Sequence, residues 1–158
     1  MKAGQRQYLL GLGSNLGDRA YYIEQAVTAL AALPETNILA ISEAFDSDPV
    51  GYKEQDAFLN ICLAITCDFN PEGLLAACLS IETKLGRIRT IKDGPRTIDI
   101  DVLFYEGGDV ELPELTLPHP RWQERGFVIF PLRHLLQAPA LAKDASWDWL
   151  RAKVASLP

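Results

Sequence analysis

The chain has 158 residues, of which 48% are hydrophobic and 23% are charged. This balance excludes disordered, collagen-like and low-complexity chains, and we expect residues 1–158 to form one domain with a sizeable core. Twenty-one Asp and Glu outnumber fifteen Lys and Arg, which gives a net charge of −6. Proteins that bind nucleic acid non-specifically usually carry the opposite sign, so the charge argues against that function.

The N-terminus and the cysteines indicate an intracellular protein. Residues 1–6 lead directly into a strand-like run rather than into the long apolar segment of an export signal. The longest uncharged apolar stretch, residues 57–67, is well below the ~20 residues that a membrane-spanning helix needs. Cys62, Cys67 and Cys78 lie in apolar surroundings without CxxC spacing, so we expect buried thiols rather than disulfides or zinc ligands. We expect a cytoplasmic protein that binds no membrane.

The first half of the chain predicts three strands and one helix. Apolar residues at helical spacing end at Pro34, which stops the helix, and a later continuous apolar run is typical of a central strand covered on both faces. The predicted elements are a strand at residues 7–12, a glycine-rich turn, a helix at 19–33, a strand at 38–45, a loop at 46–56 and a strand at 58–67.

The second half predicts a helix, a strand pair and a helical C-terminal extension. Asn70 is the expected N-cap of the helix, Pro71 its first residue and Gly86 its C-terminal cap. The later elements are a loop at residues 87–96, a strand at 97–105, a turn at 107–108, a partner strand at 110–112, and helices at 127–136 and 146–154, the last capped by Ser146.

The order of these elements, βα-ββ-α-ββ, predicts an α+β fold. Two helices packed on one side of a mixed or antiparallel sheet account for this order better than a doubly wound parallel sheet does. We therefore expect a ferredoxin-like layer with a C-terminal helical extension.

Residues 84–96 form a local positive field on an acidic chain. A concentrated positive charge on such a protein favours one small polyanion, for example a triphosphate, over a polymer. The alternative is an ordinary solvated face. The charged residues of this window are one acid, Asp93, and five of the fifteen basic residues, Lys84, Arg87, Arg89, Lys92 and Arg96.

Asp99 and Asp101 follow this window and alternate with apolar residues. In a strand both carboxylates point to one face, while Ile98, Ile100 and Val102 point to the opposite layer. Two adjacent carboxylates repel each other unless a cation or an arginine relieves the repulsion. Hard oxygen ligands favour Mg²⁺ or Mn²⁺ over zinc. A metal with a bound phosphate explains the pair best, and the alternative is an edge strand whose polar residues face water.

The segment GLGSNLG at residues 11–17 has two explanations. It invites comparison with a dinucleotide-binding fingerprint, but its third glycine is one place late and the chain has no Gly-Lys-Ser/Thr. We favour a structural explanation, in which the glycines let the strand-to-helix turn pack closely.

The chain has only two histidines. His119 lies between Pro118 and Pro120, where it could either reach a phosphate oxygen or fill a corner of the fold. His134 lies on the periodic segment 127–136, and we expect it to be structural or at the surface.

Residues 94–103, GPRTIDIDVL, resemble the signature of the 6-hydroxymethyl-7,8-dihydropterin pyrophosphokinase family of folate biosynthesis. The resemblance extends roughly from residue 8 to residue 136. Further landmarks in the family's order are GLGSNLG at 11–17, FLN at 58–60, Glu82 with GRIR at 86–89, LPHP at 117–120, RGF at 125–127 and PL at 131–132.

The resemblance implies an enzyme that transfers a pyrophosphoryl group from ATP to the hydroxymethyl oxygen of 6-hydroxymethyl-7,8-dihydropterin and releases AMP. It implies that Asp99 and Asp101 hold two Mg²⁺ ions that bridge the triphosphate. Arg87 and Arg96 would stabilise the charge of the transition state. The loops at residues 46–56 and 87–96 would close over the reactants to exclude water.

The resemblance also assigns contacts to both substrates. Phe58 and Phe127 would stack on the flat pterin, and Asn60 would bind its polar edge. The other implied residues are Ser47, Asp48 and Val50 around the pterin, and Glu82, Arg89, Thr116, His119 and Arg125 around ATP.

Four residues depart from the family pattern, namely Asp48, Leu79, Asp93 and Pro120. These departures bear on lid packing and nucleotide affinity rather than on the reaction.

Two other functions stay open. A different two-metal phosphotransferase or nucleotidyltransferase could use the same aspartate pair, and a ferredoxin-like domain could bind a ligand without catalysis. The sequence does not define the oligomeric state, and we expect a monomer.

Overall fold

An antiparallel sheet with the strand order β2-β4-β1-β5, and with the short β3 paired to β4, forms the centre of the fold. The computed structural model describes residues 4–47, 55–87, 97–120 and 126–155, and only the backbone of residues 126–130. The strand order of the sheet matches the predicted ferredoxin-like layer. Its elements are β1 (Arg6–Ser14), α1 (Arg19–Ala31), β2 (Asn37–Ile41), β3 (Phe45–Ser47), β4 (Phe58–Cys67), α2 (Pro71–Lys84) and β5 (Asp99–Tyr105).

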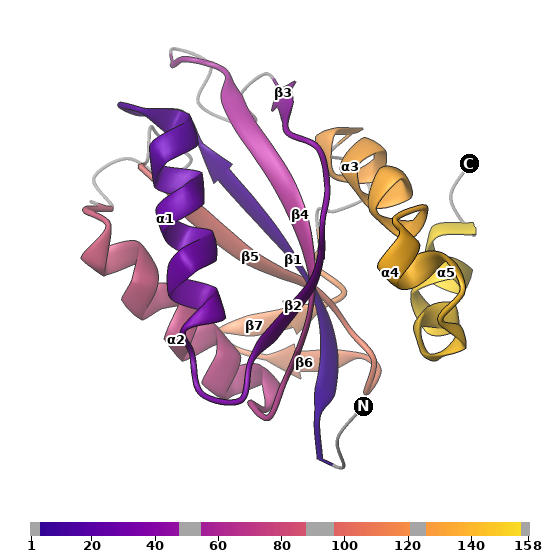
Figure 1. The fold of residues 1–158 in the computed structure, drawn as a ribbon. Helices are drawn as coiled ribbons and strands as arrows, with labels where there is room; N and C mark the ends of the chain where they lie inside the picture. The colour runs from indigo at the N-terminus through magenta and orange to yellow at the C-terminus, as the bar shows by residue number, and fades with distance from the viewer. Residues whose placement is uncertain (1–3, 48–54, 88–96, 121–125, 156–158) are drawn as a thin grey trace.

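Helices cover both faces of the sheet (Figure 1). α1 and α2 pack on one face, and the C-terminal helices pack on the other. This arrangement confirms the predicted fold class and its C-terminal helical extension. The C-terminal elements are α3 (Gly126–Leu136), α4 (Pro139–Ala142), a 3₁₀ turn (Ala145–Trp147) and α5 (Asp148–Ala155).

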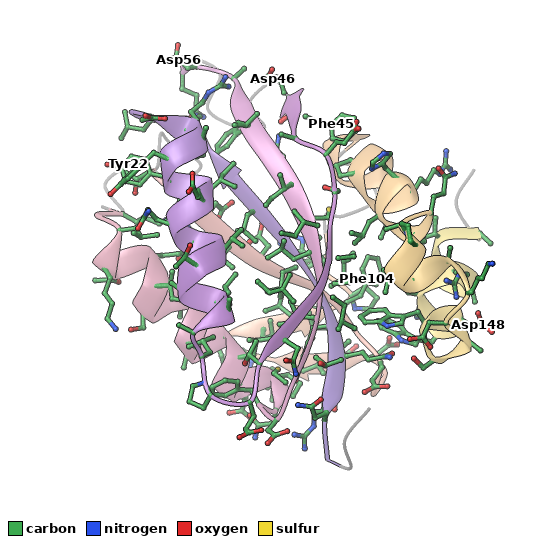
Figure 2. All side chains as sticks on the ribbon, viewed as in Figure 1. Tyr22, Phe45, Asp46, Asp56, Phe104 and Asp148 are labelled. Carbon is green, nitrogen blue, oxygen red and sulfur yellow. The ribbon has the colours of Figure 1, made fainter. Side chains whose placement is uncertain are left out.

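Strand β4 contributes to two separate cores. Ile61 and Leu63 pack on the side of α1 and α2, whereas Cys62 and Ala64 pack on the side of the C-terminal helices. Figure 2 shows Phe104 of β5 on this second side, between the strands and the C-terminal helices. A strand buried on both faces has a nearly continuous apolar sequence. For this reason the sequence predicts β4 with the observed bounds.

Helix α2 has the caps that the sequence predicts. The side chain of Asn70 accepts a hydrogen bond from a backbone N–H in the first turn, at 2.8 Å. At the other end, Gly86 has φ 87°, and its N–H donates to the carbonyl of Thr83 at 3.1 Å. The N–H of Arg87 donates to the carbonyl of Glu82, also at 3.1 Å. These two bonds are those of a Schellman motif, which turns the chain away from the helix at Arg87.

The first part of the glycine-rich segment, residues 11–14, continues strand β1, and only its last part forms the predicted turn. Gly11 and Gly13 both pair with neighbouring strands on either side. The turn into α1 comes later, at Gly17, where φ is 74°. Helix α1 then begins after its N-cap, Asp18, whose side chain accepts from the N–H of Tyr21.

The predicted strand at residues 38–45 is interrupted. β2 ends at Ile41, and β3 begins at Phe45. Between them Ser42 still binds β4, because its N–H donates to the carbonyl of Cys62 at 2.9 Å and its Oγ accepts from the Cys62 N–H at 2.8 Å. The first two residues of the predicted loop at 46–56 belong to β3 instead. Residues 48–54 of that loop lie outside the described part of the chain.

Two predictions for the last third of the chain are wrong. β6 (Val110–Leu112) pairs with β7 (Leu115–Leu117) rather than with β5, because the turn at residues 113–114 closes a tighter hairpin. Ser146 does not cap the last helix. It lies in the 3₁₀ turn, where its N–H donates to the carboxylate of Asp144 at 3.0 Å, and α5 begins at Asp148.

The three cysteines are free and buried, as predicted. Burial raises the pKa of Cys62 and of Cys78 to about 12, so both thiols stay protonated at neutral pH. In the described part of the chain, the helices are too short or too polar to cross a membrane.

Candidate active site

Predicted site residues of β4 and β5 lie in one row across the sheet, on either side of β1. Gly13 of the central strand β1 pairs with Asn60 of β4 on one side and with Asp99 of β5 on the other. Gly11 of β1 pairs in the same way with Asp101. Residues directly opposite in neighbouring strands point to the same face, with Cα atoms ~5 Å apart. Asn60 and Asp99 therefore flank a position that has no side chain.

Asp99 and Asp101 share one face of β5, as the strand period predicts. Ile98 and Ile100 point the other way, into the core beneath α1 and α2. β5 is an edge strand of the five-stranded sheet, as the polar-edge alternative requires. Asp99 nevertheless does not simply face water, because its side chain is only 17% exposed and is bound to Arg87.

Arg87 binds two carboxylates at once. Its Nη1 lies 2.8 Å from Oδ1 of Asp99 and 2.7 Å from Oε2 of Glu82. The Arg87 and Glu82 side chains are 10% and 3% exposed, so solvent screens these contacts little. Burial lowers the pKa of Arg87, but the carboxylates of Asp99 and Glu82 outweigh burial and raise this pKa above its ordinary value. Arg87 is therefore fully charged.

Glu82 also binds the backbone of β5. The N–H of Ile100 donates to Oε2 of Glu82 at 2.7 Å. An edge strand leaves alternate backbone groups without a partner in the sheet, and the Glu82 carboxylate satisfies the one between Asp99 and Asp101. The contact of Glu82 with the nucleotide stays a prediction, and the structure adds a structural role for this residue.

Glu82→Ala is expected to destabilise the fold by about 2–4 kcal/mol, because it leaves the Ile100 N–H and part of the Arg87 charge without a partner. Glu82→Gln keeps an oxygen acceptor for the N–H and should lose less. Urea unfolding measures both. Glu72→Gln, at an exposed acid on the same helix, is the control and should change stability by about 0.5 kcal/mol or less. Equal unfolding midpoints for Glu82→Ala and the control would contradict this role.

A cavity of about 390 Å³ adjoins Arg87. Leu79, Glu82, Thr83 and Arg87 line it. Leu79, which departs from the family pattern, is 42% exposed, and the hydroxyl of Thr83 donates to its backbone carbonyl at 3.0 Å. This volume is in the usual range for small-molecule sites. The predicted nucleotide contact Glu82 therefore lies at a cavity that also contains Arg87.

Asn60 is held in one orientation by β3. Its Nδ2 donates to Oγ of Ser47 at 2.7 Å and to the carbonyl of Phe45 at 3.2 Å. A carbonyl only accepts, so the amide nitrogen must face β3 and the amide oxygen must face away from it. Ser47, predicted from the resemblance as a pterin contact, thus orients Asn60. Phe58, 8% exposed, lies two residues earlier on β4.

Two of the other predicted ATP contacts, Thr116 and His119, lie beside β5. Thr116 is an exposed residue of β7, a strand that contacts both β5 and α2. The backbone N–H of His119 donates to the carbonyl of Leu103 at 2.9 Å. These contacts hold the segment of Thr116 and His119 beside β5. The bonded residue of β5, Leu103, lies two residues after Asp101.

Several predicted site residues lie outside the described part of the chain. Phe127 is in the first turn of α3, where the structure describes the backbone alone. Their roles stay predictions from the sequence. The residues without a described position are Asp48, Val50, Arg89, Arg96 and Arg125, and also Asp93, one of the departures from the family pattern.

Comparison with known proteins identifies the family of this chain. Residues 9–137 match the family model of 7,8-dihydro-6-hydroxymethylpterin-pyrophosphokinase. The chain belongs to this pyrophosphokinase family. A 2-amino-4-hydroxy-6-hydroxymethyldihydropteridine pyrophosphokinase of Methylorubrum extorquens is 49% identical over 126 residues, which are 80% of each chain. The enzyme of the same name from Bacillus subtilis is 41% identical over 128 residues, 81% of this chain and 77% of that protein.

Larger proteins contain the same pyrophosphokinase fold. The folic acid synthesis protein fol1 of Schizosaccharomyces pombe is 39% identical over 149 residues, which are 94% of this chain and 20% of that protein. A crystal structure of Plasmodium falciparum HPPK-DHPS with pterin and p-hydroxybenzoate superposes with a TM-score of 0.63 at 14% identity. It covers 94% of this chain and 43% of that chain, so this chain spans less than half of the larger protein. At this identity the likeness concerns the fold alone.

Because the chain belongs to a pyrophosphokinase family, we interpret the glycine-rich segment as part of that fold and not as a dinucleotide-binding fingerprint. Its residues 11–14 lie within β1, and none of them forms the strand-to-helix turn that such a fingerprint needs. Sequence reasoning did not identify Gly13 as part of the site. The available signal was its position within a strand, because a glycine inside a strand often marks a close approach of other groups.

Proposed function

We propose that this chain catalyses pyrophosphoryl transfer from ATP to the hydroxymethyl group of 6-hydroxymethyl-7,8-dihydropterin, a step of folate biosynthesis, and releases AMP. The observation that carries the proposal is the buried Arg87 against Asp99, next to Asp101, at the end of the sheet that also holds Asn60. The site thus combines a cation for phosphate oxygens, two carboxylates and an amide that can bind a heterocycle.

Asp99 and Asp101 are the proposed Mg²⁺ ligands. They fit this metal, because both offer hard oxygen donors from one face of the same strand. In the described part of the chain no group of three His, Cys, Asp or Glu residues could hold a metal by itself. Mg²⁺ usually completes its coordination with substrate phosphates and water. Two bound Mg²⁺ ions would neutralise the triphosphate and align it.

Arg87 is proposed to stabilise charge on the transferred group. The described hydrogen bonds of its side chain all come from Nη1. The guanidinium is planar, so fixing one nitrogen also fixes the direction of the others, which can then bind phosphate oxygens. Arg96 is proposed for the same task from its place in the family signature.

Phe58 and Asn60 are the proposed pterin contacts, together with Phe127. Asn60 presents its amide oxygen away from β3, where it can accept a hydrogen bond from a ring N–H. The Phe58 ring provides an apolar surface for the flat pterin.

Phe58→Leu should weaken pterin binding by about 0.5–1.5 kcal/mol, roughly threefold to tenfold, because it removes the aromatic face but keeps apolar volume. ATP binding should stay within about twofold. Titration of the pterin and of an ATP analogue, each followed by calorimetry, measures both affinities. Phe104→Leu alters a buried aromatic residue between the sheet and the C-terminal helices and is the matched control. Equal losses for both ligands, or the same loss in the control, would contradict the assignment.

One assay tests the reaction itself. The chain is incubated with ATP, Mg²⁺ and 6-hydroxymethyl-7,8-dihydropterin, and the nucleotide products are separated. AMP formation that requires the pterin supports the proposal. Release of pyrophosphate would favour a nucleotidyltransferase, and pterin binding without turnover would favour a binding domain. Repeating the assay with EDTA tests the proposed dependence on Mg²⁺.

The single-domain organisation, the monomeric state and the cytoplasmic location expected from the sequence stay predictions. Limited proteolysis tests the single-domain organisation. Size-exclusion chromatography with light scattering measures the oligomeric state, and cell fractionation tests the location.

A further inference from the structure

Gly13 lies at the centre of the proposed site, although it carries no functional group. It is the residue of β1 that pairs with both Asn60 and Asp99. A Cβ atom at Gly13 would lie 2.9 Å from Oδ1 of Asn60 and 3.3 Å from Cδ1 of Phe58. The first distance is shorter than the contacts that carbon and oxygen atoms tolerate, so a side chain at residue 13 would displace Asn60.

Asn60 cannot move away at little cost. Its Nδ2 is bound to Ser47 and to the backbone of Phe45 on the opposite side, at 2.7 and 3.2 Å. Asn60 is 6% exposed, and Phe58 is 8% exposed. A rotation that relieves the contact with residue 13 would break these hydrogen bonds or push into packed neighbours.

We propose that Gly13 is a positioning residue of the pterin site. Its missing side chain lets the amide of Asn60 and the ring of Phe58 lie against β1, with the amide oxygen of Asn60 directed over the strand toward the side of Asp99. This inference rests on the proposed function, because it assumes that Asn60 and Phe58 bind the pterin. It explains why a glycine lies inside a central strand, where an amino acid with a side chain would ordinarily be more stable.

The chain offers a closely matched control in Gly11. It lies on the same strand and the same face, and the three atoms nearest to a Cβ there all belong to the side chain of Leu103, with Cδ1 at 3.0 Å. Gly11→Ala therefore measures the general cost of adding a methyl group to this face of β1. Gly13→Ala measures the same cost together with the displacement of Asn60 and Phe58.

The test compares wild type, Gly13→Ala, Gly11→Ala, Asn60→Ala and the double variant Gly13→Ala/Asn60→Ala. Thermal unfolding first selects the temperature at which every variant is folded. Pterin binding is then measured by calorimetry with Mg²⁺ and saturating α,β-methylene ATP, whose α–β bridge resists cleavage. Binding of this ATP analogue is measured separately.

Gly13→Ala should weaken pterin binding about tenfold or more, the effect of overpacking a well-packed contact, and should leave binding of the ATP analogue within about twofold. Gly11→Ala should leave both affinities within about twofold. In the Asn60→Ala background the further loss from Gly13→Ala should be much smaller, because the displaced amide is already absent. A merely structural role would instead weaken both ligands and add to the effect of Asn60→Ala.

The two ideas can fail separately. Normal pterin affinity in Gly13→Ala, with weakened affinity in Asn60→Ala, would overturn the role of Gly13 and keep the proposed pterin site. An undiminished effect of Gly13→Ala in the Asn60→Ala background would also overturn it. Normal pterin affinity in Asn60→Ala would overturn the proposed pterin contact and, with it, the role of Gly13.

Discussion

Replacing Asp99 or Asp101 by Asn is expected to lower kcat by at least ~100-fold, because each change removes a charged oxygen ligand from the proposed Mg²⁺ site. Higher Mg²⁺ concentration should restore part of the activity if the loss is one of metal affinity. Steady-state AMP formation over a Mg²⁺ titration measures this. A binding readout is available without turnover, since Mn²⁺ bound with ATP can be followed by electron paramagnetic resonance.

The control for these variants is Asp109→Asn, at an exposed aspartate whose nearest described cation, Lys153, is 3.8 Å away. It should leave kcat and metal affinity unchanged. Asp99→Asn also weakens the contact with Arg87, so the unfolding midpoint of each variant must be measured alongside. Near-normal turnover of a folded Asp99→Asn or Asp101→Asn variant at the original Mg²⁺ concentration would show that the pair does not hold the metal.

Arg87→Ala is expected to lower kcat and kcat/KM together. The loss should correspond to about 2–4 kcal/mol of transition-state stabilisation, because a fixed charge that acts mainly in the transition state is removed. Arg87→Lys should not restore the rate. A lysine could still bind Glu82 or Asp99, but it has no second nitrogen that could reach a phosphate while the first binds the carboxylates. Single-turnover measurement of AMP formation separates the chemical step from product release.

Arg133→Ala, at an exposed arginine in the last turn of α3, is the control and should be without effect. A raised KM with unchanged kcat in Arg87→Ala would assign Arg87 to ground-state binding of ATP instead. A normal single-turnover rate would leave it only a structural role between α2 and β5. Steady-state and single-turnover measurements on Arg96→Ala test Arg96 in the same way. Its role rests on the sequence alone.

The elements predicted with nearly correct bounds are those whose signals are local. Helix α2 is defined by the Asn70 cap and by Gly86, and both act within one turn of the helix. Strand β4 is defined by a run of apolar residues that two cores require. One error falls where partners distant in the sequence decide, because β1 continues through its glycines where β4 and β5 bind it on both sides. The other error has a local cause, since the two-residue turn after β6 pairs it with β7 rather than with β5.

The sequence by itself determined the ferredoxin-like layer, the shared face of Asp99 and Asp101, and the family signature, because strand period, helix caps and a contiguous motif need no tertiary contact. Only the tertiary structure decided that Glu82 binds both Arg87 and the backbone of β5, that Ser47 orients Asn60, and that Gly13 lies between Asn60 and Asp99. The contact between Glu82 and Arg87 is local, but Arg87 and Glu82 meet β5 only because α2 packs beside that strand. The contacts of Ser47 with Asn60, and of Gly13 with Asn60 and Asp99, depend on the pairing register of the strands, which follows from packing of the whole sheet.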